Sequence, residues 1–587
     1  MKQFLLTFAA VILAAFLLFM IPLIVISAIA TASMSSEEPE VRKGTVITLD
    51  ISEPLADRDM DSPSYRVRNA FSGASAVHGL NTLCDNLDAA ADDDNVVALY
   101  VKGASVGTNL ANARALRKAI ADFKTRSGKP VYYFDNAIMS CAALYVATAA
   151  DSVFVAQEGM VGMDGPMVSK LFYKGLADKL GISFDIIKHG KYKSAVEPFF
   201  RDSMSPEDKA QNQRLVDVVW NEMRDSITAA RHIAAAELDN FVDNLDYIAG
   251  NCQPAVNLGL IDGGRYYDQV EESLRSVAGI APDEDLDLLS IYDYSGSSSS
   301  SLASDKVAVV YAEGQIFDGV SENDEANIYG DDLAATIRKL RKDKDVKAIV
   351  MRVNSPGGSA LASDVVWREV KLAKAEKPFI VSMGGYAASG GYYISCAADY
   401  IYAEPTTITG SIGVYGMIPN VEKAAENAGI GFDYVGSSKN PVITGFKALD
   451  PAAKAALQRS VENTYDTFVN HVSEGRGKTY AEIDSIAQGR VWMGYDALAL
   501  GLVDALGNID DAIDYAAETA GLEDYDVVDY PEVDDSPFAI LKQIGFSVRL
   551  GLGHMLIGQE FDYFNKMKEQ LQSEPTKVWA ICDVDVK

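Results

Sequence analysis

Two short segments carry residues whose types could do chemistry. "ITGSIGV" (408–414) places Ser411 between two glycines, and "GKYKSAVEPF" (190–199) contains Lys191 and Lys193. A serine hydroxyl is a poor nucleophile until a base takes its proton, and no histidine lies near this serine in the sequence. A lysine serves as the base when its amine is kept neutral, as in Ser–Lys variants of the catalytic triad. The two segments therefore predict a serine nucleophile activated by a lysine.

The chain contains an internal repeat that relates these segments. Residues 128–165 align without a gap to residues 376–413, at an offset of 248, and Lys-Pro and Ala-Ala-Asp recur at matching positions. We therefore divide the chain into five parts: an anchor with its linker (1–43), a first domain (44–293), a Ser-rich linker (294–304), a second domain (305–520) and a C-terminal extension (521–587).

The two copies differ at the residues that could react. Ser411 aligns with Met163, although the flanking glycines are kept, and Lys193 aligns with Pro441. Each copy thus holds one half of a serine–lysine pair. This pattern predicts a single active site shared between the two domains, with Ser411 as nucleophile and Lys193 as general base.

Acyl transfer also needs donors that stabilise an oxyanion. "NSPGGSA" supplies Gly357 and Gly358 directly after an apolar run, where backbone N–H groups can approach a carbonyl. The N–H of Ile412 is a further candidate donor. The nearby "GGYAASGG" (384–391) is interpreted as close helix packing through small residues that also opens room for a substrate chain.

The elements that must position these residues alternate in type. "VVALYVK" (96–102) and "KAIVMRV" (347–353) are nearly continuous apolar runs, which suit buried parallel strands. "LANARALRKAI" and "SDVVWREVKLAKA" have helical spacing. The fold class predicted from this alternation is α/β with crossover connections.

Composition excludes several other classes of function. The formal net charge is −31, which argues against a nucleic-acid partner because such binding needs a basic face. The five cysteines are scattered and have neither the spacing of a zinc site nor that of a disulfide framework. We predict no cofactor and no metal.

The N-terminus predicts a membrane anchor. Residues 4–30 carry no charge and are long enough to cross a bilayer, with Lys2 before them and acidic residues after them. The positive-inside rule then places the body of the chain outside the cytoplasm, which is the periplasm in a bacterium. A second apolar stretch, 538–558, is interrupted by glycines and charges, and it is a poor span; it could lie at the membrane surface or at a subunit contact.

The motifs "VNSPGGS", "GGYAASGGYYIS", "ITGSIGV" and "GKYKSAVEPF" resemble the signal peptide peptidase A (protease IV) family in its long tandem form. This resemblance implies two tandem Clp-protease/crotonase-like domains after a transmembrane helix. It implies a Ser411–Lys193 dyad split between them, with the Gly357 loop in the oxyanion hole. It favours Lys193 over Lys191, because the family lysine precedes Ser-Ala-Val-Glu-Pro. It also implies a homotetramer on the periplasmic face of the inner membrane that cleaves residual, hydrophobic signal peptides.

Two other functions compete with a membrane-anchored serine endopeptidase. A crotonase-type acyl-CoA enzyme would share the fold and the stabilisation of an oxyanion by backbone donors. However, CoA thioesters are cytoplasmic, and the predicted export of the chain argues against this function. A catalytically inactive membrane scaffold is conceivable because one copy is visibly degenerate.

Overall fold

The computed structural model describes residues 41–59, 77–248, 250–282, 284–294, 303–321, 327–437, 444–532 and 579–581. The predicted anchor at 4–30 and the apolar stretch at 538–558 lie outside these ranges. Across the ranges given, no helix combines the length and the apolar character that a membrane span requires.

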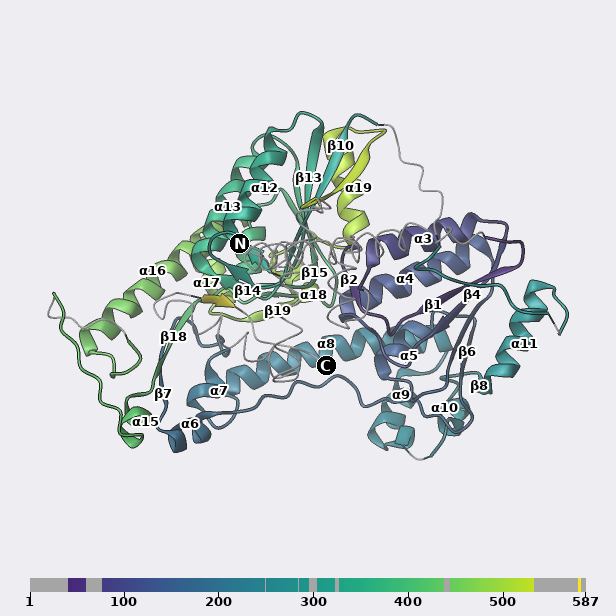
Figure 1. Cartoon of the computed structure of the whole chain (residues 1–587), viewed down its shortest axis with the longest axis horizontal. Helices are drawn as coiled ribbons and strands as arrows, with labels where there is room; N and C mark the ends of the chain where they lie inside the picture. Colours follow the sequence, from purple (N-terminus) through teal and green to yellow (C-terminus); the bar gives the residue numbers. More distant parts are fainter. Residues whose placement is uncertain are drawn as a thin grey trace, which may run out of the picture.

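The first unit is built on a parallel sheet flanked by helices (Figure 1). Its strands, in spatial order, are β8 (Gly263–Gly264), β6 (Ser152–Val155), β5 (Val131–Asp135), β4 (Val96–Lys102), β1 (Thr45–Asp50) and β9 (Leu288–Ser290). Its main helices are α3 (Leu80–Asp92), α4 (Leu110–Ser127), α5 (Cys141–Ala147), α8 (Pro206–Arg231), α9 (Ala235–Asp243), α10 (Gln253–Leu258) and α11 (Tyr267–Ala278). A short pair, β2 (Leu55–Ala56) and β3 (His78–Gly79), precedes α3.

The second unit repeats this plan. Its strands, in spatial order, are β20 (Ala505–Leu506), β16 (Tyr400–Ala403), β15 (Phe379–Ala388), β13 (Val346–Ser355), β10 (Lys306–Glu313) and β21 (Asp526–Tyr530), with β17 (Ile408–Gly410) and β19 (Val491–Met493) extending from β15. Its helices are α12 (Gly330–Lys342), α13 (Ala360–Lys374), α14 (Gly390–Ser395), α16 (Pro451–Arg476), α17 (Tyr480–Ile486), α18 (Gly494–Leu500) and α19 (Ile509–Ala520).

The two sheets correspond strand for strand, which bears out the repeat seen in the sequence. The parallel bridge between Met139 and Val161 recurs 248 residues later between Ala387 and Thr409. Strand β21 pairs with β10 and lies beyond residue 520. The folded part of the second unit therefore extends past the boundary that we expected from the sequence.

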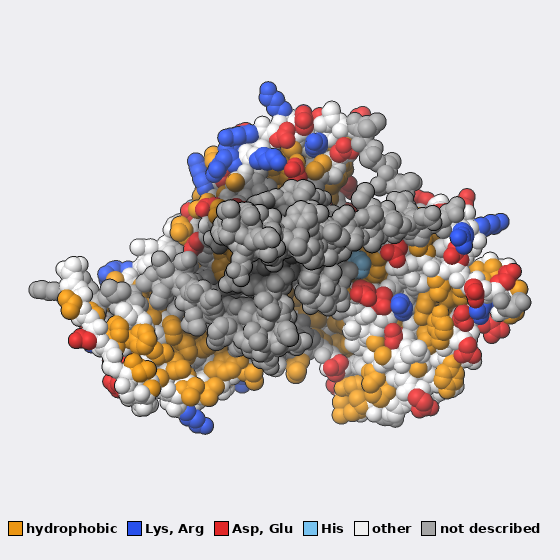
Figure 2. Space-filling model, viewed as in Figure 1, with side chains coloured by type: hydrophobic (Ala, Val, Ile, Leu, Met, Phe, Trp, Pro, Cys, Tyr) orange, Lys and Arg blue, Asp and Glu red, His pale blue; other side chains and the backbone are white. Residues whose placement is uncertain are grey.

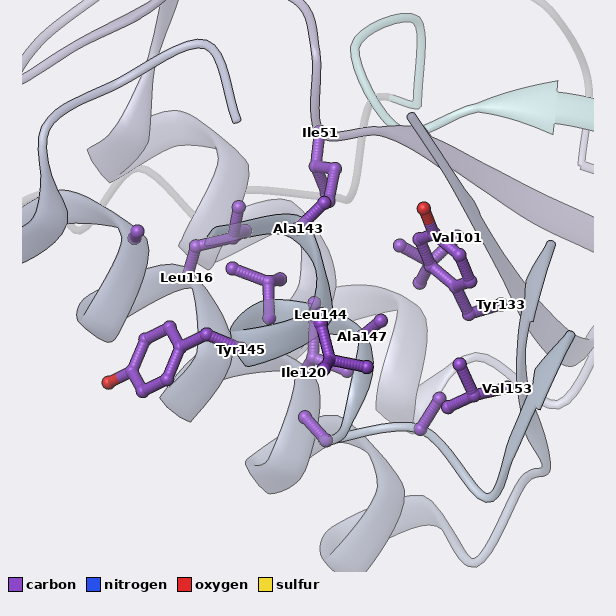
Figure 3. Packing of buried hydrophobic residues seen from close by; sticks show 14 of the residues in the cluster. Ile51, Val101, Leu116, Ile120, Tyr133, Ala143, Leu144, Tyr145, Ala147 and Val153 are labelled. Carbon is purple, nitrogen blue, oxygen red and sulfur yellow. The ribbon is translucent and has the colours of Figure 1, made fainter. Parts of the chain in front are cut away.

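Each unit has its own core between the sheet and the helices that cover it. In Figure 3, Leu144 on α5 lies between Leu116 of α4 and the sheet residues Val101 and Val153, and all four side chains are fully or almost fully buried. This packing explains why the strands read as continuous apolar runs, since helices cover one face of the first sheet and α11 packs on part of the other.

One segment leaves the first unit and joins the second. After α6 (Lys174–Leu180), strand β7 (Ser183–Lys188) pairs antiparallel with β18 (Tyr415–Asn420) of the second unit. Figure 1 shows β7, α6 and α7 (Glu197–Phe200) beside β18 and α15 (Glu422–Asn427), away from the first sheet. Strands β7 and β18 belong to a third sheet. Its strands, in spatial order, are β12 (Ile328–Tyr329), β11 (Ile316–Phe317), β14 (Gly357–Ser359), β22 (Trp579–Ile581), β18 and β7. This crossing carries Lys193 to the second unit.

Candidate active site

The amine of Lys193 lies between two serines of the second unit. Lys193 Nζ donates to Ser389 Oγ at 2.7 Å, to Ser411 Oγ at 2.9 Å and to the carbonyl oxygen of Ser411 at 3.2 Å. All three residues are at most 2% exposed. Burial disfavours the charged form of an amine, which is the form that cannot accept a proton. The structure thus brings together Ser411 and Lys193, the two residues that the repeat predicted as partners.

Ser389 has the backbone geometry of an activated nucleophile. It stands between the end of β15 and the start of α14, with φ 55° and ψ −112°. A non-glycine residue in this region costs about 1–3 kcal/mol, and such strain clusters at functional sites. A serine on a strained strand-to-helix turn is the arrangement called a nucleophile elbow, which holds Oγ clear of its own backbone.

Hydrogen bonds to Arg490 and to Lys193 hold Ser411 in place. Its backbone has φ 49°, its N–H donates to the carbonyl oxygen of Arg490 at 2.7 Å, and its own carbonyl and hydroxyl oxygens both accept from Lys193. Because both oxygens of Ser411 accept hydrogen bonds from Lys193 Nζ, they fix the orientation of the lysine amine. This arrangement suits a residue that orients the lysine.

Contacts with the second unit clamp the loop that carries Lys193. A Cβ built on Gly489 would lie 2.6 Å from Lys193 Cβ, so only glycine allows this approach. Upstream, the His189 ring stacks on Tyr465 with centroids 3.7 Å apart, and its Nδ1 contacts a carboxylate oxygen of Glu462. Both contacts come from the α16–α17 region. The amine is therefore positioned by the second unit, although it belongs to the first.

The glycine loop lies beside the strained serine. Gly357 has φ 100°, and a Cβ on Gly358 would lie 2.0 Å from the carbonyl oxygen of Ile316. A Cβ on Gly391, in the first turn of α14, would lie 2.6 Å from the carbonyl oxygen of Ser355. The N-terminal end of α14 and the Gly357 loop are thus in direct contact. They form a place where backbone donors from both could face a carbonyl next to Ser389.

Ile412, the other predicted oxyanion donor, lies on the lysine side of the site. It is fully buried, and its carbonyl oxygen accepts from the Gly489 N–H at 2.8 Å. The amide that directly follows Ser389 is that of Gly390, and in a nucleophile elbow this is the amide that faces the oxyanion.

The corresponding place in the first unit holds no hydroxyl nucleophile. At the 248-residue offset Cys141 stands where Ser389 does and Met163 where Ser411 does, and both are buried. Burial, with a smaller contribution from Asp164, raises the pKa of the Cys141 thiol to about 12. The thiol therefore stays protonated near neutral pH and is a poor nucleophile.

Sequence reasoning missed Ser389. The signal was present, because "GGYAASGG" follows an apolar run and aligns with a segment that has Cys141 in place of the serine. The glycines around it suggested helix packing, which they also perform, since Gly391 abuts Ser355. The strained φ of Ser389 is a property of the folded turn, and the residue types around it do not predict this φ.

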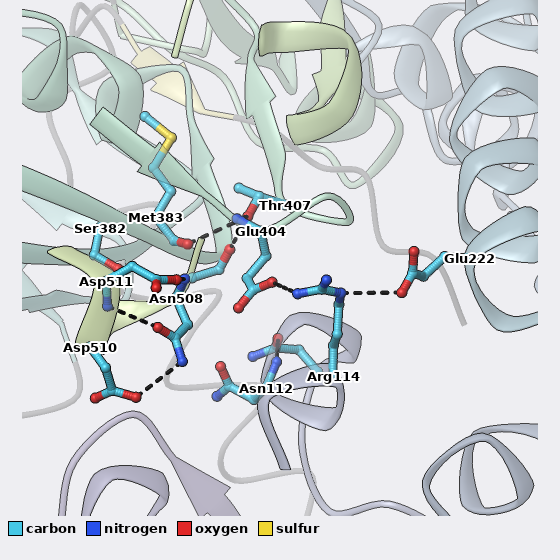
Figure 4. Close-up of polar contacts among 12 residues, drawn as sticks. Asn112, Arg114, Glu222, Ser382, Met383, Glu404, Thr407, Asn508, Asp510 and Asp511 are labelled. Atoms are coloured by element: carbon cyan, nitrogen blue, oxygen red, sulfur yellow. Dashed lines mark hydrogen bonds and ion pairs between the residues drawn. The ribbon is translucent and has the colours of Figure 1, made fainter. Parts of the chain in front are cut away.

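A partly buried polar network joins the two units (Figure 4). Arg114 of α4 donates to Glu404 at 2.6 Å and to Glu222 at 3.2 Å. Arg352 of β13, 4% exposed, donates at 3.2 Å to Asp57 of the first unit. Because the lysine and the serines come from different units, this interface helps to hold the two halves of the site in register.

The described residues contain no cluster of three or more His, Cys, Asp or Glu that could hold a metal ion.

The chain is similar in sequence to known proteases over most of its length. The family model of peptidase family S49 matches residues 124–281 and 371–523, and the family model of Clp protease matches residues 298–409. A protein named Protease 4 from Salmonella typhi is 37% identical over 505 residues, which covers 84% of this chain and 80% of that protein. A chloroplastic serine protease SPPA from Arabidopsis thaliana is 30% identical, over 88% of this chain and 76% of that protein. A putative signal peptide peptidase SppA from Enterococcus faecium is 34% identical over 35% of this chain and 59% of that protein.

Proposed function

The chain belongs to peptidase family S49 and is a serine peptidase with an α/β, Clp-protease-like fold, and on that premise we propose that it uses Lys193 as the general base of a site shared between its two repeats. The observation that carries this proposal is the position of the Lys193 amine, 2.7 Å from Ser389 Oγ and 2.9 Å from Ser411 Oγ.

We assign the attack on the scissile carbonyl to Ser389. Lys193 Nζ takes the hydroxyl proton as Ser389 Oγ bonds to the carbonyl carbon, and the amine then returns this proton to the leaving nitrogen as the C–N bond breaks. The N–H groups of Gly358 and Gly390 stabilise the oxyanion. The N–H of Gly357 donates to Ser355 Oγ at 3.1 Å and holds this loop in place. Water, deprotonated by the same amine, releases the acyl group. Ser411 holds the amine in place through its two oxygens.

Ser411 remains the alternative nucleophile, as the sequence first predicted, because its Oγ is also within reach of the amine. Three observations favour Ser389: its strained strand-to-helix turn, its contact with the glycine loop through α14, and the use of both Ser411 oxygens in holding the lysine.

Active-site labelling separates the two serines. The full-length chain is treated with a fluorophosphonate, and the modified peptide is identified by mass spectrometry. We expect stoichiometric label on Ser389, unchanged labelling in Cys141→Ala, and at least a hundredfold slower labelling in Lys193→Ala. Label on Ser411 would transfer the nucleophile role to that residue. Labelling that is unaffected in Lys193→Ala would remove the lysine from the mechanism, and a chain that takes no label and cleaves no peptide would be an inactive scaffold.

The substrate class and location form the second part of the proposal. We propose a membrane-anchored endopeptidase, held by residues 4–30 on the periplasmic side of the bacterial inner membrane as a homotetramer, that cleaves residual signal peptides after export. The uncharged segment with Lys2 before it supports the anchor and its orientation, and the name of the Enterococcus relative, a putative signal peptide peptidase, supports the substrate class. Protease added to spheroplasts should digest the body of the chain, whereas full protection would reverse the orientation.

A further inference from the structure

The loop that carries the base is held by backbone contacts on both sides of Lys193. Directly upstream, the Tyr192 N–H donates to the carbonyl oxygen of Gln488 in the second unit at 3.0 Å. Directly downstream, the carbonyl oxygen of Ser194 accepts from the Glu197 N–H at 2.9 Å, which closes a turn that leads into α7. These contacts set the course of the chain, and a side chain of α8 lies against the loop at the same point.

Gln211 of α8 donates to both neighbours of Lys193. Its Nε2 lies 3.3 Å from the carbonyl oxygen of Tyr192 and 2.9 Å from Ser194 Oγ. Both Gln211 and Ser194 are buried, and a hydrogen bond is stronger away from water. The amide group therefore restrains the backbone before the base and the side chain after it.

The oxygen of the same amide contacts the second unit. Gln211 Oε1 accepts from the backbone N–H of Val491, the first residue of β19, at 3.3 Å. The orientation of the amide follows from its partners, because a backbone N–H can only donate and the carbonyl oxygen of Tyr192 can only accept. One side chain of the first unit thus joins the base loop to a strand of the second unit.

The segment around Val491 also holds Ser411. The carbonyl oxygen of Arg490 accepts from the Ser411 N–H at 2.7 Å, and Val491, the next residue, is the one that donates to Gln211. The Gln211 amide thus ties the base loop to the segment that holds this serine next to the amine. Because Ser389 and Ser411 both belong to the second unit, the bond to Gln211 helps to set the distance between the lysine amine and the two serines.

A buried ion pair holds the Gln211 side chain in place. Charged side chains normally lie at the surface, as they do on the face of the molecule in Figure 2. The side chains of Lys170 and Asp208 are instead 8% and 0% exposed, with Lys170 Nζ 3.1 Å from Asp208 Oδ1. Asp208 lies one turn before Gln211 on α8, and the same Oδ1 accepts from Gln211 Nε2 at 3.1 Å. The ion pair therefore restrains the amide that contacts the base loop.

We propose that Gln211 is a positioning residue for the general base, and that its side-chain amide holds both neighbours of Lys193 at a fixed distance from the serines of the second unit. This inference rests on the proposed function, in which Lys193 is the base. Gln211 acts through the lysine and takes no part in the bonds that form and break. Such positioning matters because a misplacement of about 1 Å in a catalytic group lowers the rate about a hundredfold.

The first test replaces Gln211 by methionine in the full-length chain. Gln211→Met keeps the length of the side chain and removes its donors and its acceptor. We expect kcat for a fluorogenic peptide and the rate of fluorophosphonate labelling to fall about tenfold at neutral pH, because the remaining contacts of the loop limit the displacement of the lysine. KM should stay within about twofold, because the displaced group acts in the chemical step and not in binding.

The matched control is Gln213→Met on the same helix. Gln213 is exposed, and its Nε2 donates to Asp217 at 2.8 Å, away from the base loop. This variant loses the same side-chain amide and the same kind of hydrogen bond, so it should keep the kcat, the KM and the labelling rate of the wild type.

The pH profile of kcat separates positioning from a general loss of structure. An amine that moves away from the two serines gains water, and water favours its charged form. The acid limb of the profile should therefore move to higher pH in Gln211→Met, and part of the activity should return in alkaline buffer, which also shows that the variant is folded. The other charged and titratable groups packed around the loop are the same in Gln211→Met and in the control: Lys170, Lys188, His189, Glu197, Asp208 and Arg490.

Ser194→Ala supplies a second and smaller change at the same contact. It removes the acceptor that lies 2.9 Å from Gln211 Nε2, so it should lower kcat less than Gln211→Met and move the acid limb in the same direction. The double variant Ser194→Ala/Gln211→Met should be no slower than Gln211→Met, because the two residues act through one hydrogen bond and their effects do not add.

The outcomes distinguish this inference from the proposed function. A wild-type kcat in Gln211→Met, or a loss of kcat with an unmoved acid limb, would overturn the positioning role. If that variant does not fold, Ser194→Ala decides, and a wild-type kcat and acid limb in it would overturn the role as well. If Lys193→Ala takes no label while Gln211→Met behaves as the wild type, only this inference fails. If Lys193→Ala is labelled at the wild-type rate, the lysine is not the base and both proposals fail.

Discussion

Gly489 lies so close to Lys193 that an added Cβ would stand 2.6 Å from the lysine Cβ and 2.8 Å from its backbone nitrogen. Gly489→Ala should therefore push the Lys193 loop away from Ser389 and lower kcat/KM by about a hundredfold, because a shift of about 1 Å in a catalytic group costs on this order. Steady-state cleavage of a fluorogenic peptide measures the effect.

The matched control for this variant is Gly477→Ala. Gly477 has a similar backbone, with φ 61° against 77° for Gly489, but a Cβ there meets nothing within 4 Å. Both variants place an alanine in a left-handed backbone conformation and are strained for that reason. A difference in kcat/KM between them therefore reports the contact of residue 489 with Lys193. Equal activity in the two would contradict the view that Gly489 positions the base.

The first repeat should not become active when its nucleophile is restored. Cys141→Ser recreates the hydroxyl at the position equivalent to Ser389, but the residue equivalent to Lys193 in the second unit is Pro441, which cannot accept a proton. We expect Cys141→Ser and Met163→Leu to keep activity within about twofold, and Ser389→Ala/Cys141→Ser to be as inactive as Ser389→Ala. Peptide cleavage above that baseline in the double variant would show a second functional base.

Much of the scaffold followed from residue patterns, because these patterns reflect burial. Runs such as "VVALYVK" are apolar at successive positions, and they form central strands of the sheets. The repeat at an offset of 248 residues agrees with the bridges Met139–Val161 and Ala387–Thr409, which occupy matching positions in the two units. The pairing of Ser411 with Lys193 could also be predicted, because the loss of each partner in the other copy marks them as a pair.

Other features depend on docking that no local pattern encodes. Ser389 looked like part of a packing motif until its strained backbone and its distance to Lys193 distinguished it. The crossing of β7 to β18, which brings the lysine to the second unit, is a contact between segments more than 200 residues apart. Arg352 and Asp57 could not be paired from sequence either, since each would be an ordinary charged residue outside this interface.

Loss of the Arg352–Asp57 pair should cost both stability and activity. Each residue is 4% exposed, and removing one partner of a buried pair costs about 3–5 kcal/mol because the other charge stays buried. We expect Arg352→Met to lower the midpoint of thermal unfolding and to reduce cleavage, since the lysine and the serines lie on the two units that this pair joins. Differential scanning fluorimetry and peptide cleavage measure the two effects.

An exposed ion pair supplies the control. Lys118 and Asp122, one turn apart on α4, have side chains 61% and 50% exposed, and such pairs contribute at most about 0.5 kcal/mol. Lys118→Met should leave both the unfolding midpoint and cleavage nearly unchanged. A similar loss in the two variants would mean that the buried pair does not hold the units together.

Glu313 should make stability depend on pH. Burial at the end of β10, and then the negative charge of Asp57, raise the pKa of this carboxyl to about 7, while Arg352 and Arg58 act in the opposite direction. The folded chain therefore binds a proton more readily than the unfolded chain, whose carboxyl has the ordinary pKa of about 4.3. The stabilisation that this proton gives is fully present below the ordinary value and is lost as the pH rises through about 7. Between pH 5.5 and 8 the unfolding midpoint should fall in the wild type more than in Glu313→Gln, which stays neutral throughout. The difference between the two chains removes the titrations of groups that do not interact with Glu313, and parallel curves would mean that Glu313 is already charged in the folded state at pH 5.5.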